Sequence, residues 1–274
     1  MAKMQGGFIM PDFYSSICLT SVKSTVLELF GLEKSRGDTN ANPVITAQNG
    51  GRKIDRAVIY NPDAVALWLY MKYTDKFTDC LLNSDLALPV LSVMPSVTPV
   101  CFGSMYTGVM PEKHGIMKYE KPVLRCETLF DRMLAAGKKC AICSTEGDSI
   151  SKIFLEREMD YFIYDTEDEV NNKALELIEK GEHDLIVIYN GDYDGTMHRW
   201  GPEAPETLEK LDKNIFVFKT LVEKIRQCRK GERVFYGFCP DHGCHEIDGG
   251  CGSHGLDCED DMNVIHFYGI KEAE

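Results

Sequence analysis

Side chains that can bind a metal ion or attack a substrate follow several apolar segments of this chain. They are Asp63 after segment 57–60, Thr98 after 89–94, Asp194 and His198 after 185–189, Asp241 and His242 after 234–239, and finally His254. Carboxylates and imidazoles together are typical ligands of Zn²⁺ and similar divalent cations. The pattern therefore predicts a metal site, provided that these segments meet in space.

Thr98 has features of a nucleophile. It can act as an N-cap, and Pro99 suits the first position of a helix over 100–107, because an N–H would have no partner there. We expect the free N–H groups at this helix start to face whatever Thr98 attacks, which favours a phosphoryl group. A bound metal ion would lower the pKa of the Thr98 hydroxyl and activate it.

Apolar segments alternate with amphipathic ones along the chain. The alternation predicts strands at 57–60, 89–94, 140–144, 161–164, 185–189, 234–239 and 264–268, and helices at 63–73, 128–136, 167–180 and 205–228. Such alternation is typical of a three-layer α/β/α sandwich with a mostly parallel central sheet. Ligands gather at the carboxyl ends of the strands in such sheets, which is where the candidate residues lie.

The sequence shows no convincing domain boundary, so we expect residues 1–274 to form a single domain. Residues 31–52, rich in Gly, Asn and Lys, fit either a loop or a short helical cover. The sequence leaves these two alternatives open.

The charge of the chain argues against a nucleic-acid partner. Thirty Lys and Arg residues against forty-three Asp and Glu residues give a net charge of −13, which repels a polyanion. We also expect no membrane partner and a cytoplasmic location, because no long uninterrupted apolar run and no signal-like start is present. The eleven cysteines are then expected to remain thiols, with Cys140 and Cys143 packed in the core.

Five motifs together resemble the nucleotide pyrophosphatase/phosphodiesterases and phosphonoacetate hydrolases of the alkaline phosphatase superfamily. The longest joins Thr98 to Thr107-Gly108 and to PEKHGI at 111–116, at the spacing of the family's nucleophile segment. The others are Asp63 after the first strand, DGTMH at 194–198 with Gly201-Pro202, DHG at 241–243 and GSHG at 252–255. All five occur in family order.

The resemblance implies a two-metal hydrolase that cleaves a phosphate mono- or diester through a phosphothreonine at Thr98. Its partner would be a small phosphorylated substrate. The implied ligands of one ion are Asp63, Thr98, Asp241 and His242, and those of the other are Asp194, His198 and His254. Zn²⁺ is the usual metal of these families, with Mn²⁺ as the alternative.

The sequence departs from the family pattern at positions expected to surround the substrate. The asparagine expected twenty-one residues after the nucleophile is replaced by Tyr119, with Lys121 close by. We therefore predict that Tyr119 or Lys121 contacts a phosphate oxygen. Only twelve residues separate His242 from His254, where larger members insert a lid, so a small, open pocket is expected.

Several alternatives remain open at this stage. A phosphomutase would have the same fold, and a protein that binds metal without catalysis would keep the same ligands. Cysteines and histidines between 239 and 258 could instead form a structural zinc knuckle. Asp192 competes with Asp194 as a ligand, although the four-residue step to His198 favours Asp194.

Overall fold

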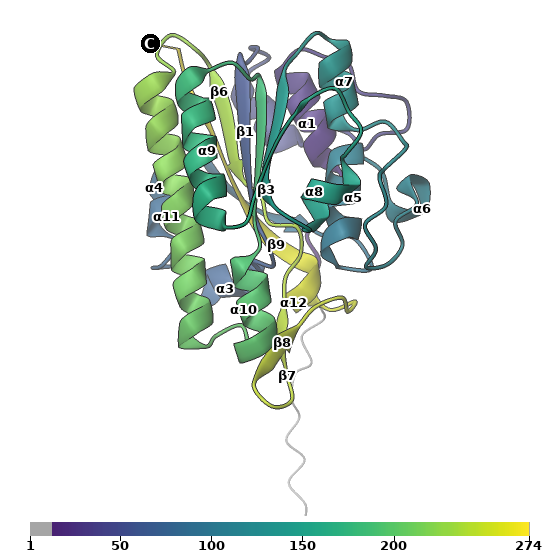
Figure 1. Ribbon diagram of the computed structural model, residues 1–274, viewed down its shortest axis with the longest axis vertical. Helices are drawn as coiled ribbons and strands as arrows, with labels where there is room; N and C mark the ends of the chain where they lie inside the picture. Colours follow the sequence, from purple (N-terminus) through teal and green to yellow (C-terminus); the bar gives the residue numbers. More distant parts are fainter. Residues whose placement is uncertain (1–12, 274) are drawn as a thin grey trace, which may run out of the picture.

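A seven-stranded sheet forms the middle layer of the computed structural model, which describes residues 13–273 (Figure 1). The strand order is β2-β9-β6-β1-β5-β3-β4. The strands are β1 (Arg56–Pro62), β2 (Leu86–Leu91), β3 (Cys140–Thr145), β4 (Asp160–Tyr164), β5 (Leu185–Asn190), β6 (Val234–Phe238) and β9 (Asn263–Lys271). The two pairings of β9, with β2 and β6, are antiparallel and the other four are parallel, so the predicted mostly parallel sheet is confirmed.

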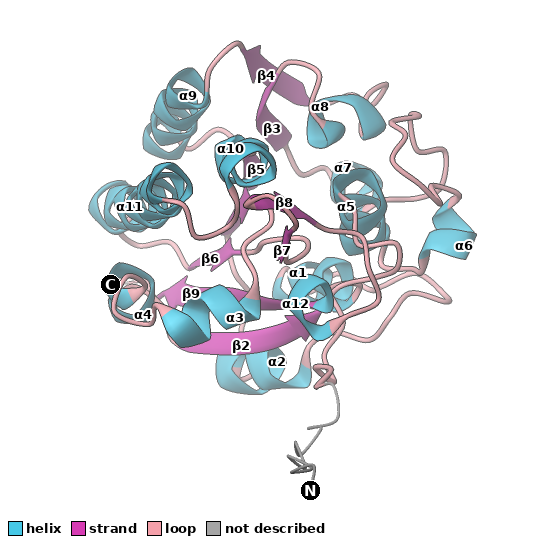
Figure 2. Cartoon of the chain, turned by 90° about the horizontal axis from the view of Figure 1, so that it is seen from below, coloured by secondary structure: helices cyan, strands magenta, loops and turns pink. Residues whose placement is uncertain are grey.

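Helices cover both faces of the sheet, as Figures 1 and 2 show. One face packs against α1 (Ser21–Leu29), α2 (Pro43–Asn49), α5 (Thr98–Thr107), α7 (Leu129–Ala135) and α8 (Ser149–Ile153). The other packs against α3 (Leu67–Lys72), α4 (Thr78–Leu82), α9 (Glu167–Lys180), α10 (Asp192–Trp200) and α11 (Pro205–Cys228). Alternate residues of β1 enter the two cores, Ile59 on one side and Tyr60 on the other, as strand geometry requires.

Helices α9 and α11 coincide with the predicted ranges. The Thr166 side chain caps α9 and forms a capping box with Glu169, which fixes where the helix starts. Thr128 and Asp131 form the same motif at α7. None of the helices in the described part of the chain is long and apolar enough to cross a lipid bilayer.

Two predicted segments were wrong at their boundaries. The helix predicted over 63–73 begins only at Leu67, because Asp63 lies in a turn and Ala64 has a left-handed φ of 60°. The strand predicted over 89–94 is β2, three residues earlier; it accommodates Pro89 because it lies at the sheet edge. Within 31–52 both alternatives occur, since α2 follows a loop and is capped by Asn42.

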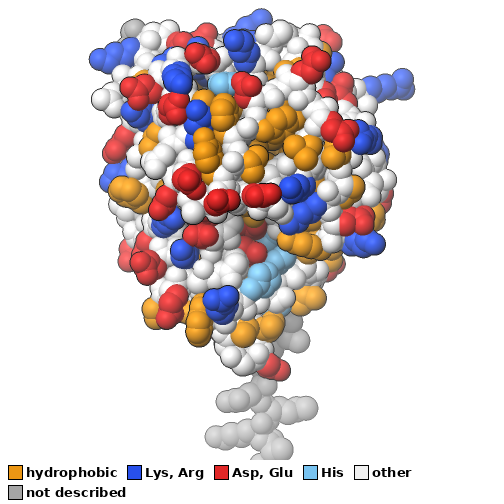
Figure 3. All heavy atoms as spheres, viewed as in Figure 1, with side chains coloured by type: hydrophobic (Ala, Val, Ile, Leu, Met, Phe, Trp, Pro, Cys, Tyr) orange, Lys and Arg blue, Asp and Glu red, His pale blue; other side chains and the backbone are white. Residues whose placement is uncertain are grey.

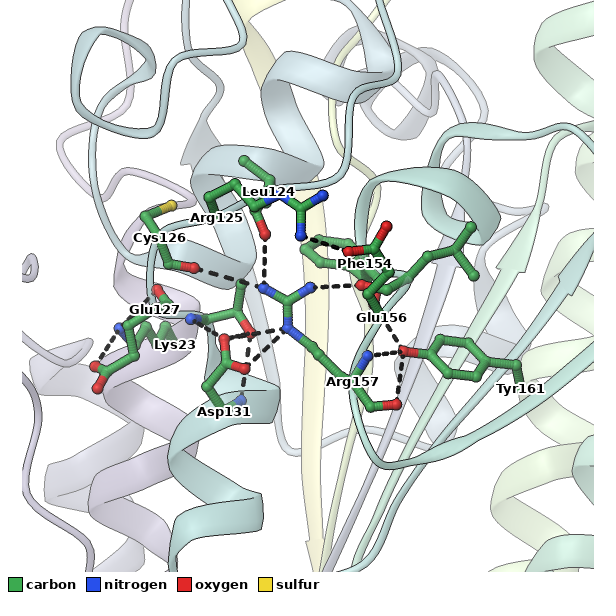
Figure 4. A network of polar contacts seen from close by, with 12 residues as sticks. Lys23, Leu124, Arg125, Cys126, Glu127, Asp131, Phe154, Glu156, Arg157 and Tyr161 are labelled. Atoms are coloured by element: carbon green, nitrogen blue, oxygen red, sulfur yellow. Dashed lines mark hydrogen bonds and ion pairs between the residues drawn. The ribbon is translucent and has the colours of Figure 1, made fainter.

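A polar network fixes the long connection between α6 (Pro111–His114) and α7. Arg157 lies at its centre (Figure 4). Its Nε donates to Asp131 Oδ1 at 3.0 Å, and its Nη2 donates to the carbonyl of Leu124 at 3.1 Å and of Cys126 at 3.5 Å. The Arg157 side chain is only 7% exposed, so these acceptors depend on it.

Arg157→Gln is expected to lower the free energy of unfolding by about 2–4 kcal/mol, because buried carbonyls and Asp131 lose their donor. Urea unfolding followed by circular dichroism measures this change. Arg125→Gln is the matched control, since Arg125 pairs with Glu156 in the same network but its side chain is 72% exposed. Equal stability of the two variants would contradict a structural role for Arg157.

Candidate metal centre

The candidate ligands come together at the carboxyl ends of three central strands. Asp63 directly follows β1, Asp241 and His242 follow β6, and Asp194 and His198 lie on α10 after β5. His254 follows β8 (Cys251–Ser253), which forms a hairpin with β7 (His245–Ile247). The seven residues that the sequence analysis proposed, Thr98 included, thus lie in two adjoining groups.

The first group consists of Asp63, Asp241 and His242, all three buried. His242 Nε2 lies 3.2 Å from Asp63 Oδ1 and 3.4 Å from Asp241 Oδ2. Thr98 belongs to this group, because its Oγ1 lies 3.4 Å from Asp63 Oδ2 and 3.3 Å from His242 Nε2. The hydroxyl therefore faces two acceptors.

The second group consists of Asp194, His198 and His254. Asp194 Oδ1 lies 3.4 Å from the Nε2 atom of each histidine, and the two Nε2 atoms are 3.1 Å apart. The rings of His254 and His242 stack at 4.0 Å, so the two groups are neighbours.

Backbone carbonyls orient all three histidines. In each ring Nδ1 donates to a carbonyl, and these pairs are His242 to Gly243 O (2.9 Å), His254 to Ser96 O (2.9 Å) and His198 to Gly252 O (3.1 Å). Since a carbonyl can only accept, Nδ1 carries a proton in each ring, and in the neutral form Nε2 presents its lone pair toward the carboxylates. Metal-binding histidines in proteins are held in this way.

The electrostatics of both groups call for a cation. One oxygen of each carboxylate is buried without a hydrogen-bond donor: Asp63 Oδ1, Asp194 Oδ1 and Asp241 Oδ2. Burial and the charge of Asp63 raise the pKa of Asp194 and of Asp241. Burial and the neighbouring His242 lower the pKa of His254 to about 2, so this ring is neutral. Unpaired carboxylate oxygens facing imidazole lone pairs fit divalent cations.

The start of α5 differs from the prediction in one respect. The helix begins at Thr98 itself, so Val97 and not Thr98 is the N-cap residue. The N–H groups of Val100 and Cys101 both donate to the carbonyl of Val97 at 3.0 Å. They are therefore not free to bind an anion. The helix start has fewer free N–H donors for a phosphoryl group than the sequence suggested.

Tyr189 is a site residue that the sequence analysis missed. Its hydroxyl donates a short hydrogen bond to Asp63 Oδ2, and its ring is buried. Tyr189 stands one residue before the end of β5. A polar tip at the carboxyl end of an otherwise apolar strand is the signal that could have identified it.

A pocket of about 340 Å³ opens beside Thr98, Asp63 and Asp194. Tyr119 and Lys121 line it, as the replacement of the family asparagine suggested. Lys121 Nζ donates to the carbonyl of Gly147 at 2.8 Å and lies 5.2 Å from the centre of the Tyr119 ring. Both side chains thus stand in the same pocket as the Thr98 hydroxyl.

The carboxylates of the other candidate groups already have hydrogen-bond or ion-pair partners. Asp192 pairs with Lys210 at 2.9 Å and does not join the second group. His245, Cys258 and Asp261 lie together, but Asp261 Oδ1 accepts from His245 Nδ1 and Oδ2 accepts from the Leu256 N–H, so the carboxylate is satisfied.

Two of the cysteines considered for a zinc knuckle cannot share one. Cys239 and Cys244 pack into the cores on opposite faces of the sheet. The predicted core packing of Cys140 and Cys143 is confirmed, and burial raises the pKa of each thiol to about 12.

Comparison with solved structures identifies the fold. Murine ectonucleotide pyrophosphatase/phosphodiesterase 5 is similar with a TM-score of 0.55 and 15% identity, over 71% of this chain and 58% of that chain. Phosphonoacetate hydrolase from Sinorhizobium meliloti 1021, in complex with phosphonoacetate, gives 0.51 and 17%, over 73% and 60%. The C-terminal periplasmic domain of EcEptC from Escherichia coli, in complex with Zn, gives 0.53 and 14%, over 81% and 73%. The chain has an alkaline phosphatase-like α/β fold.

This likeness confirms the fold that the motifs suggested. The fold is like that of an ectonucleotide pyrophosphatase/phosphodiesterase and of a phosphonoacetate hydrolase. The chain spans about 58% of the length of the murine protein, which has also been solved with AMP in an inactive variant. Comparisons with protein families and with curated proteins give no match.

The two ligand groups share no residue, so each should lose its metal independently. We expect two equivalents of Zn²⁺ per chain after dialysis against zinc, and one equivalent for Asp63→Asn or Asp194→Asn, because each amide weakens one group. Atomic absorption measures the content. Asp192→Asn is the control and should keep two equivalents; loss from this variant but not from Asp194→Asn would contradict the assignment.

Proposed function

We propose that this protein is a two-metal hydrolase that cleaves a phosphate mono- or diester through a phosphothreonine at Thr98. The observation that carries the proposal is the position of the Thr98 hydroxyl, 3.4 Å from Asp63 Oδ2 and 3.3 Å from His242 Nε2, at the edge of an open pocket. AMP and phosphonoacetate, bound in two structurally similar proteins, are both small phosphorus compounds.

The proposed metal ligands are Asp63, Thr98, Asp241 and His242 for one ion and Asp194, His198 and His254 for the other. Bound Zn²⁺ or Mn²⁺ would act as a Lewis acid, lowering the pKa of the attacking hydroxyl and neutralising charge on the phosphoryl oxygens. EcEptC, solved with Zn, makes zinc the first choice.

Thr98 then performs a two-step displacement. Its Oγ1 forms a bond to phosphorus while the bond from phosphorus to the alcohol oxygen breaks, and the alcohol leaves with a proton. Water attacks the phosphothreonine next, which releases the phosphate and restores the hydroxyl. Tyr189 stabilises Asp63 in the orientation that faces Thr98.

Lys121 is the chain's own candidate for the phosphate contact. It lines the pocket together with Thr98, and its hydrogen bond to Gly147 O uses only one of three donors. The ring of Tyr119 lies against it and limits where the ammonium group can move. In this proposal the charged Lys121 side chain contacts the phosphate in place of the asparagine amide that the family uses.

Thr98→Ala is expected to lower turnover of p-nitrophenyl phosphate by a factor on the order of 10³ or more, because the group that forms the covalent bond is lost. Steady-state assays with zinc-loaded protein measure this effect. Thr98→Ser is the control and should retain part of the activity. Mass spectrometry of acid-quenched protein should detect a phosphoryl adduct on Thr98 in the wild type only. Normal turnover by Thr98→Ala would refute the assignment of Thr98 as the nucleophile.

Lys121→Ala is expected to reduce kcat/KM by about 10²-fold, as removal of one preorganised donor to a phosphoryl oxygen does. The reference is Lys118→Ala in the same connection, because Lys118 is exposed and does not line the pocket. If both variants keep wild-type kinetics, the lysine makes no phosphate contact and Tyr119→Phe becomes the variant to assay.

A further inference from the structure

Helix α10 carries two of the three ligands of the second group, Asp194 in its first turn and His198 in its last turn. Histidines are visible in pale blue on the face that Figure 3 shows, below a group of acidic side chains. The first N–H groups of a helix have no partner within the helix, so its first turn needs acceptors from elsewhere. The position of Asp194 therefore depends on how the start of α10 is held.

The N-cap residue of α10 does not supply such an acceptor. It is Gly191, which has no side chain. A Cβ at this position would come within 2.7 Å of the hydroxyl of Tyr189, which donates to Asp63 Oδ2. A capping Ser or Asp in place of Gly191 would thus collide with a side chain that the first metal group holds in position. The cap of α10 has to come from another element.

Glu167, the first residue of α9, caps α10. Its Oε1 accepts a hydrogen bond at 2.6 Å from the N–H of Asp192, which is the first residue of α10. Its Oε2 accepts at 3.3 Å from Nδ2 of Asn190, which is the last residue of β5. One carboxylate thus holds both sides of the turn between β5 and α10.

The Glu167 side chain is itself held firmly. Glu167 is only 4% exposed, and the capping box of Thr166 and Glu169 fixes the helix start to which it belongs. Lys213 Nζ on α11 lies 3.5 Å from Glu167 Oε2 and supplies the opposite charge. Helix α11 packs against both α9 and α10, as Figure 2 shows, and so brings these groups together. A buried carboxylate with a cationic partner can hold α10 in one position.

We propose that Glu167 is a positioning residue of the second metal group, which caps α10 from α9 and thereby keeps Asp194 and His198 within reach of His254. The inference rests on the metal groups of the proposed function. Asp194 Oδ1 lies 3.4 Å from the Nε2 atom of each histidine, a spacing that fits ligands of one tetrahedral ion. A shift of the start of α10 would move Asp194 away from both rings.

Glu167→Ala is expected to lower the affinity of the second group for Zn²⁺ by about 10- to 100-fold, the usual effect of removing a group that orients metal ligands. The first group should keep its affinity, because the hydrogen bonds of Glu167 go to Asp192 and Asn190, outside that group. Competition with a chromophoric chelator measures both affinities. Burial and the charge of Asp192 raise the pKa of Glu167 to about 7, so the titration is run at pH 8, where the carboxylate is ionised.

Two further variants separate capping from a general effect on stability. Glu167→Gln keeps an acceptor oxygen for the Asp192 N–H and should restore much of the affinity that Glu167→Ala loses. Asp168→Ala is the matched control and should bind both ions normally, because the Asp168 side chain also pairs with Lys213, at 3.0 Å, but is 77% exposed. With Co²⁺ in place of Zn²⁺, the visible absorption of the second ion should change in Glu167→Ala and return in Glu167→Gln.

Three outcomes overturn the inference and leave the proposed function standing. They are wild-type affinity of both groups in Glu167→Ala, equal weakening of both groups, and a Glu167→Gln variant that binds no better than Glu167→Ala. Circular dichroism of the metal-free proteins checks folding, and if Glu167→Ala does not fold, Glu167→Asp replaces it, since the shorter side chain withdraws the oxygens from Asp192. If the wild-type protein binds fewer than two ions, the metal groups of the proposed function fail and the inference fails with them.

Discussion

The repulsion among buried carboxylates is the constraint on which the rest of this structure depends. Asp63, Asp194 and Asp241 each have a buried oxygen without a donor, and all three lie beyond the carboxyl ends of β1, β5 and β6. Anionic groups so close together destabilise a protein interior by several kcal/mol each unless cations balance them. The fold therefore gathers unbalanced negative charge at one edge of the sheet, and the Thr98 hydroxyl lies beside it.

Backbone carbonyls from distant parts of the chain orient the histidines that face these carboxylates. Carbonyls of Ser96, Gly243 and Gly252 set the three imidazoles so that lone pairs converge. Gly252 is suited to this contact, because a Cβ there would come within 2.2 Å of Met197 Sδ on α10. Close packing of the β7–β8 hairpin on α10 thus orients His198, and the same hairpin leads directly to His254.

Sequence patterns predicted the buried strands and the amphipathic helices, and the motifs picked out residues that the structure brings together at one edge of the sheet. The errors have local physical causes. Ala64 adopts a left-handed turn that no propensity indicates, and this delays α3. The antiparallel course of β9 cannot be deduced from its composition, because an apolar strand fits either direction. Tyr189 was overlooked because its aromatic ring resembles ordinary core packing until its hydroxyl partner is known.

The place of β9 between β2 and β6 has a consequence for synthesis of the protein. Segments 86–91 and 234–238, both next to the site, have no neighbour on one side until residues 263–271 have left the ribosome. Segment 86–91 therefore waits much longer than 234–238 for this partner, because Leu86 pairs with Tyr268, far along the chain. A partly synthesised chain therefore carries an exposed strand edge that could pair with another chain.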